Sequence, residues 1–147
     1  PEGEEMEVLR TTTAIQDARL RHAVTGPELI AFQRLVRKVP VSEPVMTYAL
    51  NLVRSSRRQA SGALDFIEKW VAYGASVRAA QYLILGAKAR ALTHGRYHVS
   101  FDDVRTLAHP VMRHRVLTNF HAESEGVTTD QIIDRLLEAV PMPRSGM

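Results

Sequence analysis

The chain has 147 residues and a mass of 16.5 kDa, which fits one domain with a short appendage better than two full domains. Hydrophobic residues make up 45% and charged residues 24%, values near the globular average that exclude disordered, collagen-like and fibrous classes. The net charge is only +3, and the absence of cysteine excludes a disulfide framework, a thiolate metal site and a cysteine nucleophile.

The first part of the chain predicts two helices. Residues 2–9 carry four glutamates, and Met6 and Leu9 are spaced to share one face of a short acidic helix. Thr25 is followed by glycine, proline and Glu28, so that a capping hydroxyl, an early proline and a carboxylate stand in the order typical of a helix start. A second helix is therefore expected from Thr25 onward.

The middle of the chain predicts two longer helices with an ambiguous stretch between them. Ser42 precedes glutamate and proline, which repeats the start signal, and apolar residues follow at helical spacing to about Arg58. Residues 59–74 contain a break but also apolar residues that could form a short helix or a packed loop. The run 77–92 is apolar nearly all round, as expected of a helix buried between neighbours, and Gly95 stops it.

The last third predicts two more helix starts. Ser100 and Asp103 form a capping arrangement, and the helix they open is bent or divided by Pro110. A final helix begins near Thr128, where Gln131 completes a capping box. No useful run with a period of two residues appears, so the predicted class is all-α, a bundle of six or seven helices without a sheet.

Motifs of stand-alone catalysis are missing from the sequence. There is no G-x-x-x-x-G-K-[ST] phosphate loop, G-x-S-x-G elbow, H-E-x-x-H zinc helix or EF-hand loop. The longest apolar runs are too short for a membrane span or a signal peptide. We therefore expect a soluble cytoplasmic protein that does not catalyse a reaction by itself.

The six histidines do not predict a metal site. His94 and His98 are four residues apart, as helical ligands would be, but a glycine interrupts the helix between them. His109 and His114 are separated by a proline and lack a nearby carboxylate in the sequence. Packing or surface roles are favoured for all four, and no metal ligand is expected.

Several arginines could form a nucleic-acid surface. Arg54, Arg57 and Arg58 are close together in the sequence, and Arg113 and Arg115 form a second basic group. No aromatic residues are interleaved with the first group and no recognition helix is evident, which favours a solvated helix end or an ion-pairing patch. The sequence therefore predicts no nucleic-acid partner.

One short segment has the properties of an anion site. Gly74, Ala75 and Ser76 form a small-residue turn before the helix 77–92, where unpaired amides carry partial positive charge and a phosphate can approach the backbone. Arg78 adds a forked guanidinium in the first turn. Because this position opposes the helix dipole by a few tenths to about 1 kcal/mol, an anionic partner would relieve the conflict.

A structural role for Arg78 fits the spacing equally well. Its guanidinium could reach sideways to Asp65 or Glu68 and form an ion pair within the chain. The residues alone leave both interpretations open.

Several segments, in order, resemble the MoxR-type AAA+ ATPases. Residues 74–79, GASVRA, resemble the sensor-2 motif G-A-S-P-R-A, and residues 52–57, LVRSSR, resemble L-V-R-A-T-R. Residues 95–104 resemble G-R-D-Y-V-T-P-D-D-V and residues 107–115 resemble A-L-A-x-x-V-L-R-H-R, and both ends of the chain agree as well. The match spans nearly the whole chain.

Two positions depart from the family pattern. Val77 stands where the sensor-2 motif has proline, and Phe101 replaces the proline of T-P-D-D. Proline at a helix start presets φ, so its loss loosens the turn slightly without removing Arg78.

The resemblance implies the C-terminal, helical lid of an ATPase. Residues 1–24 would be a helix leaving the missing ATPase core and a linker, residues 25–140 the lid domain, and residues 141–147 an irregular tail. The Walker A and B segments, sensor 1 and the arginine finger would lie upstream. ATP and Mg²⁺ would bind the parent protein, whereas the fragment alone would bind neither and be inactive.

The resemblance also implies a mechanism and partners. Arg78 would be the catalytic sensor-2 arginine that contacts the γ-phosphate, and Gly74, Ala75 and Ser76 would complete the nucleotide site. The family forms rings, here expected to be hexameric, and performs chaperone-like remodelling of client proteins, including ones with von Willebrand factor A domains. The alternative is a helical protein-interaction module without a nucleotide role, with Trp70 as an exposed anchor or, instead, a buried structural aromatic.

Overall fold

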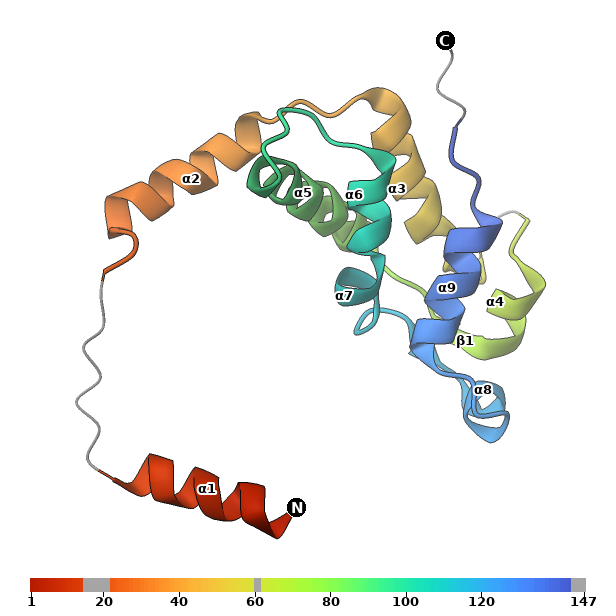
Figure 1. The fold of residues 1–147 in the computed structure, drawn as a ribbon. Coiled ribbons are helices and arrows are strands. Elements are labelled where there is room, and N and C mark those ends of the chain that lie inside the picture. Colours follow the sequence, from red (N-terminus) through yellow and green to blue (C-terminus); the bar gives the residue numbers. More distant parts are fainter. Residues whose placement is uncertain (15–21, 60–61, 144–147) are drawn as a thin grey trace. The chain divides into compact units, whose positions relative to one another are not determined.

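The computed structural model describes residues 1–14, 22–59 and 62–143, and helices dominate these ranges (Figure 1). The helices are α1 (Glu2–Thr13), α2 (Gly26–Lys38), α3 (Glu43–Ser55), α4 (Asp65–Trp70), α5 (Val77–Thr93), α6 (Phe101–Thr106), α7 (Ala108–Met112), α8 (Phe120–Ser124) and α9 (Thr129–Ala139). The strands are β1 (Val71–Tyr73) and β2 (Leu117–Thr118). The predicted all-α class is confirmed, with more helices in the described ranges than the six or seven expected.

The chain divides into two compact units, Pro1–Ala31 and Phe32–Met147, and the division falls inside α2. In the first unit, α1 buries none of its side chains. The helix start predicted near Thr25 is present at the beginning of α2. There Glu28 Oε2 accepts hydrogen bonds from the backbone N (2.8 Å) and the hydroxyl (2.7 Å) of Thr25. These bonds, the backbone one foremost, lower the pKa of Glu28 from its ordinary value.

The core of the second unit is built around α5. This helix packs against α3, α6 and α7, while α9 packs against α3 and α7 and α4 packs against α8. The largest fully buried side chains of this core include Tyr48, Leu52, Ile67, Leu83, Met112, Ile132, Ile133 and Leu136. The prediction that residues 77–92 form a helix is confirmed, but the helix is buried on one face only, because alanines line the inner side and Arg78, Gln81 and Tyr82 remain exposed.

The two capping arrangements of the last third are confirmed. The Ser100 side chain accepts from the backbone N of Asp103, and the Asp103 side chain accepts in return from the backbone N of Ser100. Thr128 and Gln131 form the same reciprocal pair at the start of α9. The predicted division near Pro110 is also present, between α6 and α7. Pro110 itself lies in the first turn of α7, where a missing N–H removes no intrahelical bond.

The expectation that no sheet is present was wrong. β1 and β2 pair antiparallel, with Val71 opposite Thr118 and Tyr73 opposite Leu117. Strands of two and three residues are too short to show a period of two, and their pairing depends on a partner more than 40 positions away. The strand β1 directly precedes the turn that leads into α5, so this small sheet helps to place the candidate site.

The ambiguous stretch resolves into α4 and β1, and its tryptophan is structural. Trp70 is only 7% exposed, its Nε1 donates to Glu125 Oε2 at 3.0 Å, and the Arg135 guanidinium lies 4.6 Å from its ring centroid. The alternative of Trp70 as an exposed binding anchor was therefore wrong, because the indole is covered by the core and by the loop after α8. Residues 60 and 61 lie outside the described residues.

Candidate functional site

The turn before α5 places Arg78 at the molecular surface. Ser76 is the N-cap of α5, and its side chain makes no capping hydrogen bond, so the first amides of the helix have no side-chain partner. Arg78 is the second residue of the helix and is exposed. Neither Asp65 nor Glu68 forms an ion pair with it, and within the described ranges its guanidinium makes no hydrogen bond or salt bridge. The geometry thus leaves a permanent cation available to an external partner.

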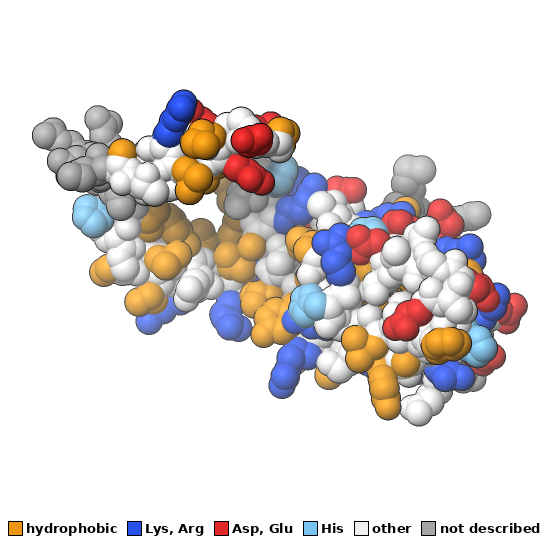
Figure 2. Space-filling model, turned by 90° about the horizontal axis from the view of Figure 1, so that it is seen from below, with side chains coloured by type: hydrophobic (Ala, Val, Ile, Leu, Met, Phe, Trp, Pro, Cys, Tyr) orange, Lys and Arg blue, Asp and Glu red, His pale blue; other side chains and the backbone are white. Residues whose placement is uncertain are grey.

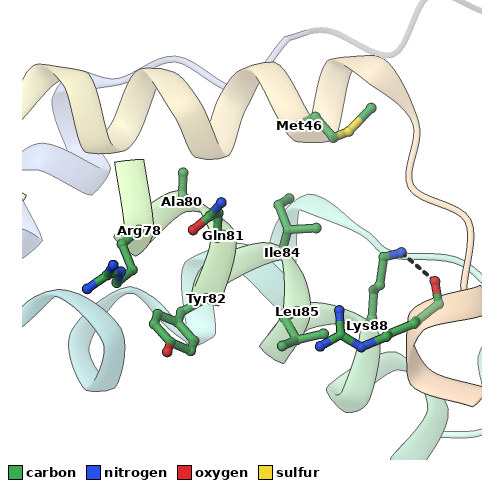
Figure 3. A pocket seen from close by; sticks show the side chains of 9 residues that line it. Met46, Arg78, Ala80, Gln81, Tyr82, Ile84, Leu85 and Lys88 are labelled. Atoms are coloured by element: carbon green, nitrogen blue, oxygen red, sulfur yellow. Dashed lines mark hydrogen bonds between the residues drawn. The ribbon is translucent and has the colours of Figure 1, made fainter. Parts of the chain in front are cut away.

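Arg78 lies at one end of an open groove with a volume of about 640 Å³ (Figure 3). The lining residues are Arg37, Met46, Arg78, Ala80, Gln81, Tyr82, Ile84, Leu85 and Lys88. Figure 3 shows Arg78 near the start of α5 and Lys88 farther along it, with Tyr82 and Leu85 between them. Lys88 Nζ donates to the backbone O of Arg37 at 3.0 Å. Three cations and no carboxylate line this groove, which favours anionic over cationic ligands.

The turn is held against the end of α3 through one residue. The backbone N of Ala75 donates to Ser56 Oγ at 2.9 Å, and Arg57 Nε donates to the backbone O of Ala75 at 2.7 Å. Ser56 and Ala75 are both fully buried. Ala75 was predicted to contact nucleotide, but both of its backbone polar groups are engaged inside the chain, so it presents no free donor to a ligand.

Sequence reasoning missed Ser56 and misplaced Arg57. Both belong to the LVRSSR segment, where Arg57 was grouped with Arg54 and Arg58 as one basic cluster. In the structure Arg57 is half-buried and bonded to the turn, while Arg54 and Arg58 are exposed. The only sequence signal for this role was that the segment belongs to the same series of motifs as residues 74–79. Spacing alone could not show that Arg57 contacts Ala75, 18 positions away.

The second basic group is also engaged within the chain. Arg113 forms two hydrogen bonds of 2.7 Å to the Asp130 carboxylate, and the Arg115 guanidinium lies 5.0 Å from the Tyr82 ring centroid. Figure 2 shows basic and acidic side chains mixed at the right-hand end of the molecule, whereas the basic side chains at the lower middle lie among hydrophobic ones. These arrangements are those of ion-pairing surfaces rather than of a continuous phosphate-binding stripe.

The histidine nearest to carboxylates is His109. Its Nε2 lies 2.9 Å from Asp134 Oδ1, and its Nδ1 lies 3.8 Å from Asp130 Oδ1. The statement that His109 lacks a nearby carboxylate was therefore wrong in three dimensions, because α7 packs against α9. Across residues 1–14, 22–59 and 62–143, no three histidine, aspartate or glutamate side chains are grouped as metal ligands.

A buried ionic cluster stabilises the far end of α5. Asp103 is fully buried and accepts hydrogen bonds from Arg90 and Arg96, each at 2.5 Å from Oδ1. The bond from Arg96 above all, aided by Ser100, holds the pKa of Asp103 well below its usual range. This cluster joins α5, the following loop and α6, and it does not contact Arg78.

Comparison with known proteins identifies the domain. Residues 67–136, which include the turn and Arg78, match the family model of the AAA lid domain. This stretch of the chain is thus an AAA lid domain.

None of the described helices is long and apolar enough to cross a membrane.

The relatives narrow the family further. The chain is 25% identical to the chaperone MoxR1 of Mycobacterium tuberculosis over 98% of its own length and 38% of the relative. It is 28% identical to the uncharacterized protein YeaC of Bacillus subtilis, over 84% of the chain and 36% of the relative. A crystal structure from Cytophaga hutchinsonii, provisionally assigned as an ATPase, superposes with a TM-score of 0.84 at 30% identity, over 98% of this chain and 44% of that one.

These findings confirm the resemblance seen in the sequence motifs. Residues 67–136 form an AAA lid domain, and the chain resembles the MoxR-type AAA+ ATPases over nearly its whole length. It spans about two fifths of the length of the relatives that it matches.

Proposed function

We propose that this lid reports the state of bound ATP through Arg78. In the complete ATPase, ATP would lie between the core and the lid, and the Arg78 guanidinium would bind the γ-phosphate. The observation that carries the proposal is an exposed arginine in the first turn of α5, without an ion pair to a described residue and at the end of a groove whose lining includes three cations and no carboxylate. Gly74 and Ser76 would border the phosphate, and Ala75 would support the turn from inside.

The proposed motion follows from differential binding. The lid binds the core more tightly while the γ-phosphate bridges them, so ATP favours the closed arrangement. Hydrolysis removes the bridging group, and the lid is then free to rotate as a rigid domain. The free arginine suits this task because its forked guanidinium matches the geometry of phosphate oxygens.

The remainder of the proposal concerns the parent protein. Residues 1–24 would lead from an upstream ATPase core, residues 25–140 would form the lid, and residues 141–147 a tail. The core would hold the Walker segments and bind ATP with Mg²⁺. Neighbouring subunits would assemble into a cytoplasmic ring, which we propose is a hexamer. Because MoxR1 is named a chaperone, the task we propose is chaperone-like remodelling of clients, including proteins with von Willebrand factor A domains.

The test is to replace Arg78 in an ATPase that contains this lid together with its core. Arg78→Ala should lower kcat for ATP hydrolysis by about tenfold to a thousandfold, the range of a lost transition-state charge contact. Arg54→Ala is the matched control, since Arg54 is exposed on α3 and its side chain makes no hydrogen bond or ion pair with a described residue. Unchanged turnover and unchanged ATP-dependent lid closure in Arg78→Ala would reject the sensor role.

A further inference from the structure

We propose that Ser56 and Arg57 are positioning residues that hold Arg78 where its guanidinium can bind the nucleotide. This inference rests on the proposed function, because it concerns the same site. Neither residue was expected to act there, and neither has to touch the nucleotide. Their effect would pass through the backbone of Ala75, three residues before Arg78.

Ala75 is attached to the end of α3 through both of its backbone polar groups. Ser56 Oγ accepts from its backbone N at 2.9 Å, and Arg57 Nε donates to its backbone O at 2.7 Å. Two consecutive residues at the end of α3 therefore satisfy both polar groups of one buried peptide segment. A buried backbone group that loses such a partner is costly, so the turn has a strong preference for this one position.

The serine hydroxyl is itself oriented. Ser56 Oγ donates to the backbone O of Val53 at 2.6 Å, so its proton points back into α3 and a lone pair faces Ala75. Alanine at position 56 would keep nearly the same volume but leave the Ala75 N–H buried without an acceptor. Threonine would keep the hydroxyl and can restore the bond.

Gly74 allows the turn to come this close. A Cβ at position 74 would lie 2.2 Å from the backbone O of Ser56 and 2.8 Å from the Cα of Arg57. These are backbone atoms that cannot rotate away, so only glycine permits the contact. The glycine is thus required by space rather than by an unusual φ, since the described positive-φ glycines are at other positions.

The attachment is transmitted to Arg78 by the first turn of α5. The backbone N of Ala79 donates to the Ser76 carbonyl at 2.9 Å, and the Ala79 side chain is fully buried. Arg78 therefore lies between two fixed points, Ala75 on one side and Ala79 on the other, while its own side chain stays exposed. A catalytic cation held on a rigid backbone loses little freedom when it meets its phosphate.

The test is a double-mutant cycle in the ATPase that contains the core and the lid. Ser56→Ala and Arg57→Ala should each lower kcat at saturating ATP by about tenfold, because a displacement near 1 Å at a catalytic group has effects of this order or greater. In the Arg78→Ala background the same substitutions should change kcat less than about twofold, since the contact they support is already gone. Ser56→Thr should restore turnover.

A second measurement separates positioning from general destabilisation. Hydrogen exchange of the peptide that contains Ala75 should accelerate in Ser56→Ala and recover in Ser56→Thr, while peptides of α6 and α9 keep their protection. Arg54→Ala, one turn earlier on α3, should alter neither exchange nor kcat.

The outcomes distinguish this inference from the function it rests on. If Arg78→Ala is impaired but Ser56→Ala and Arg57→Ala are not, or if the effects multiply in the double variants, the positioning role is overturned and the sensor role stands. If Arg78→Ala is fully active, the sensor role fails and the positioning role with it. Coupled losses with rescue by Ser56→Thr support both.

Discussion

Arg96 donates two hydrogen bonds to the buried carboxylate of Asp103, from Nη2 to Oδ1 at 2.5 Å and from Nη1 to Oδ2 at 2.7 Å. The Asp103 side chain is fully buried, whereas that of Arg96 is 31% exposed. Because the carboxylate also caps α6 through Ser100, one charge connects the end of α5, the following loop and the next helix. Removing that charge should therefore destabilise the lid more than the loss of a surface ion pair would.

The first prediction is that Asp103→Asn destabilises the chain by about 3 kcal/mol, the order found when one partner of a buried ion pair is removed. Urea unfolding at neutral pH measures the change. Asp102→Asn is the matched control, because Asp102 is 75% exposed and lies 3.4 Å from Arg90, and it should change stability by less than about 1 kcal/mol. Equal losses in the two variants would contradict the role assigned to Asp103.

The same carboxylate predicts a pH dependence with a definite sign. Its pKa is lowered in the folded state, so the unfolded chain binds the proton more readily and acid favours unfolding. The stabilisation should be complete above about pH 4, the ordinary carboxyl pKa, and decline as the pH falls toward the lowered native value. The Asp103→Asn variant should lack this part of the acid-induced decrease in the free energy of unfolding. A variant curve parallel to that of the unmodified chain down to acidic pH would exclude Asp103 as its source.

The second prediction concerns the close approach at Gly74. Gly74→Ala should destabilise the chain by about 1 to 3 kcal/mol, as expected for overpacking against rigid backbone atoms. Thermal or urea unfolding provides the measurement. Gly26→Ala serves as the control, because nothing lies within 4 Å of a Cβ at that position and its φ is not unusual. Stability of Gly74→Ala equal to that of Gly26→Ala would show that the turn can move away from α3 without loss.

The parts of the fold that sequence predicted well depend on local chemistry. The starts of α6 and α9 follow from a hydroxyl and an acid or amide three residues later, and both capping boxes form as expected. The all-α class follows from the same local signals, summed along the chain. Arg78 was singled out because small residues precede it and because its charge opposes the dipole of its own helix.

What the sequence could not predict depends on contacts between distant positions. The Arg57–Ala75 bond joins residues 18 apart, and His109 meets Asp134 across 25 positions. The pairing of Val71 with Thr118 spans a still longer separation and involves strands with no period to detect. In each case the residue types permit the contact, but only the packing of helices selects it.

The third prediction uses Trp70, the one tryptophan of the chain. Trp70→Ala should destabilise the chain by about 3 kcal/mol or more, because a buried indole leaves a large cavity. Circular dichroism followed during urea unfolding measures the loss. Tyr97→Ala is the control, since Tyr97 is 80% exposed and should tolerate truncation. A Trp70→Ala variant as stable as Tyr97→Ala but unable to bind a partner would revive the interaction-anchor alternative.

The last prediction is that the chain alone binds ATP only weakly, with a dissociation constant no tighter than about 1 mM, corresponding to roughly 4 kcal/mol of binding free energy. Arg78 can supply one charged contact, and the groove beside it is open, so most of the phosphate surface would remain in water. Isothermal titration calorimetry at low salt measures the affinity directly. Any weak heat that does appear should vanish in Arg78→Ala and persist in Arg54→Ala. A micromolar dissociation constant for the isolated chain would contradict a site shared between core and lid, because the lid would then bind the nucleotide by itself.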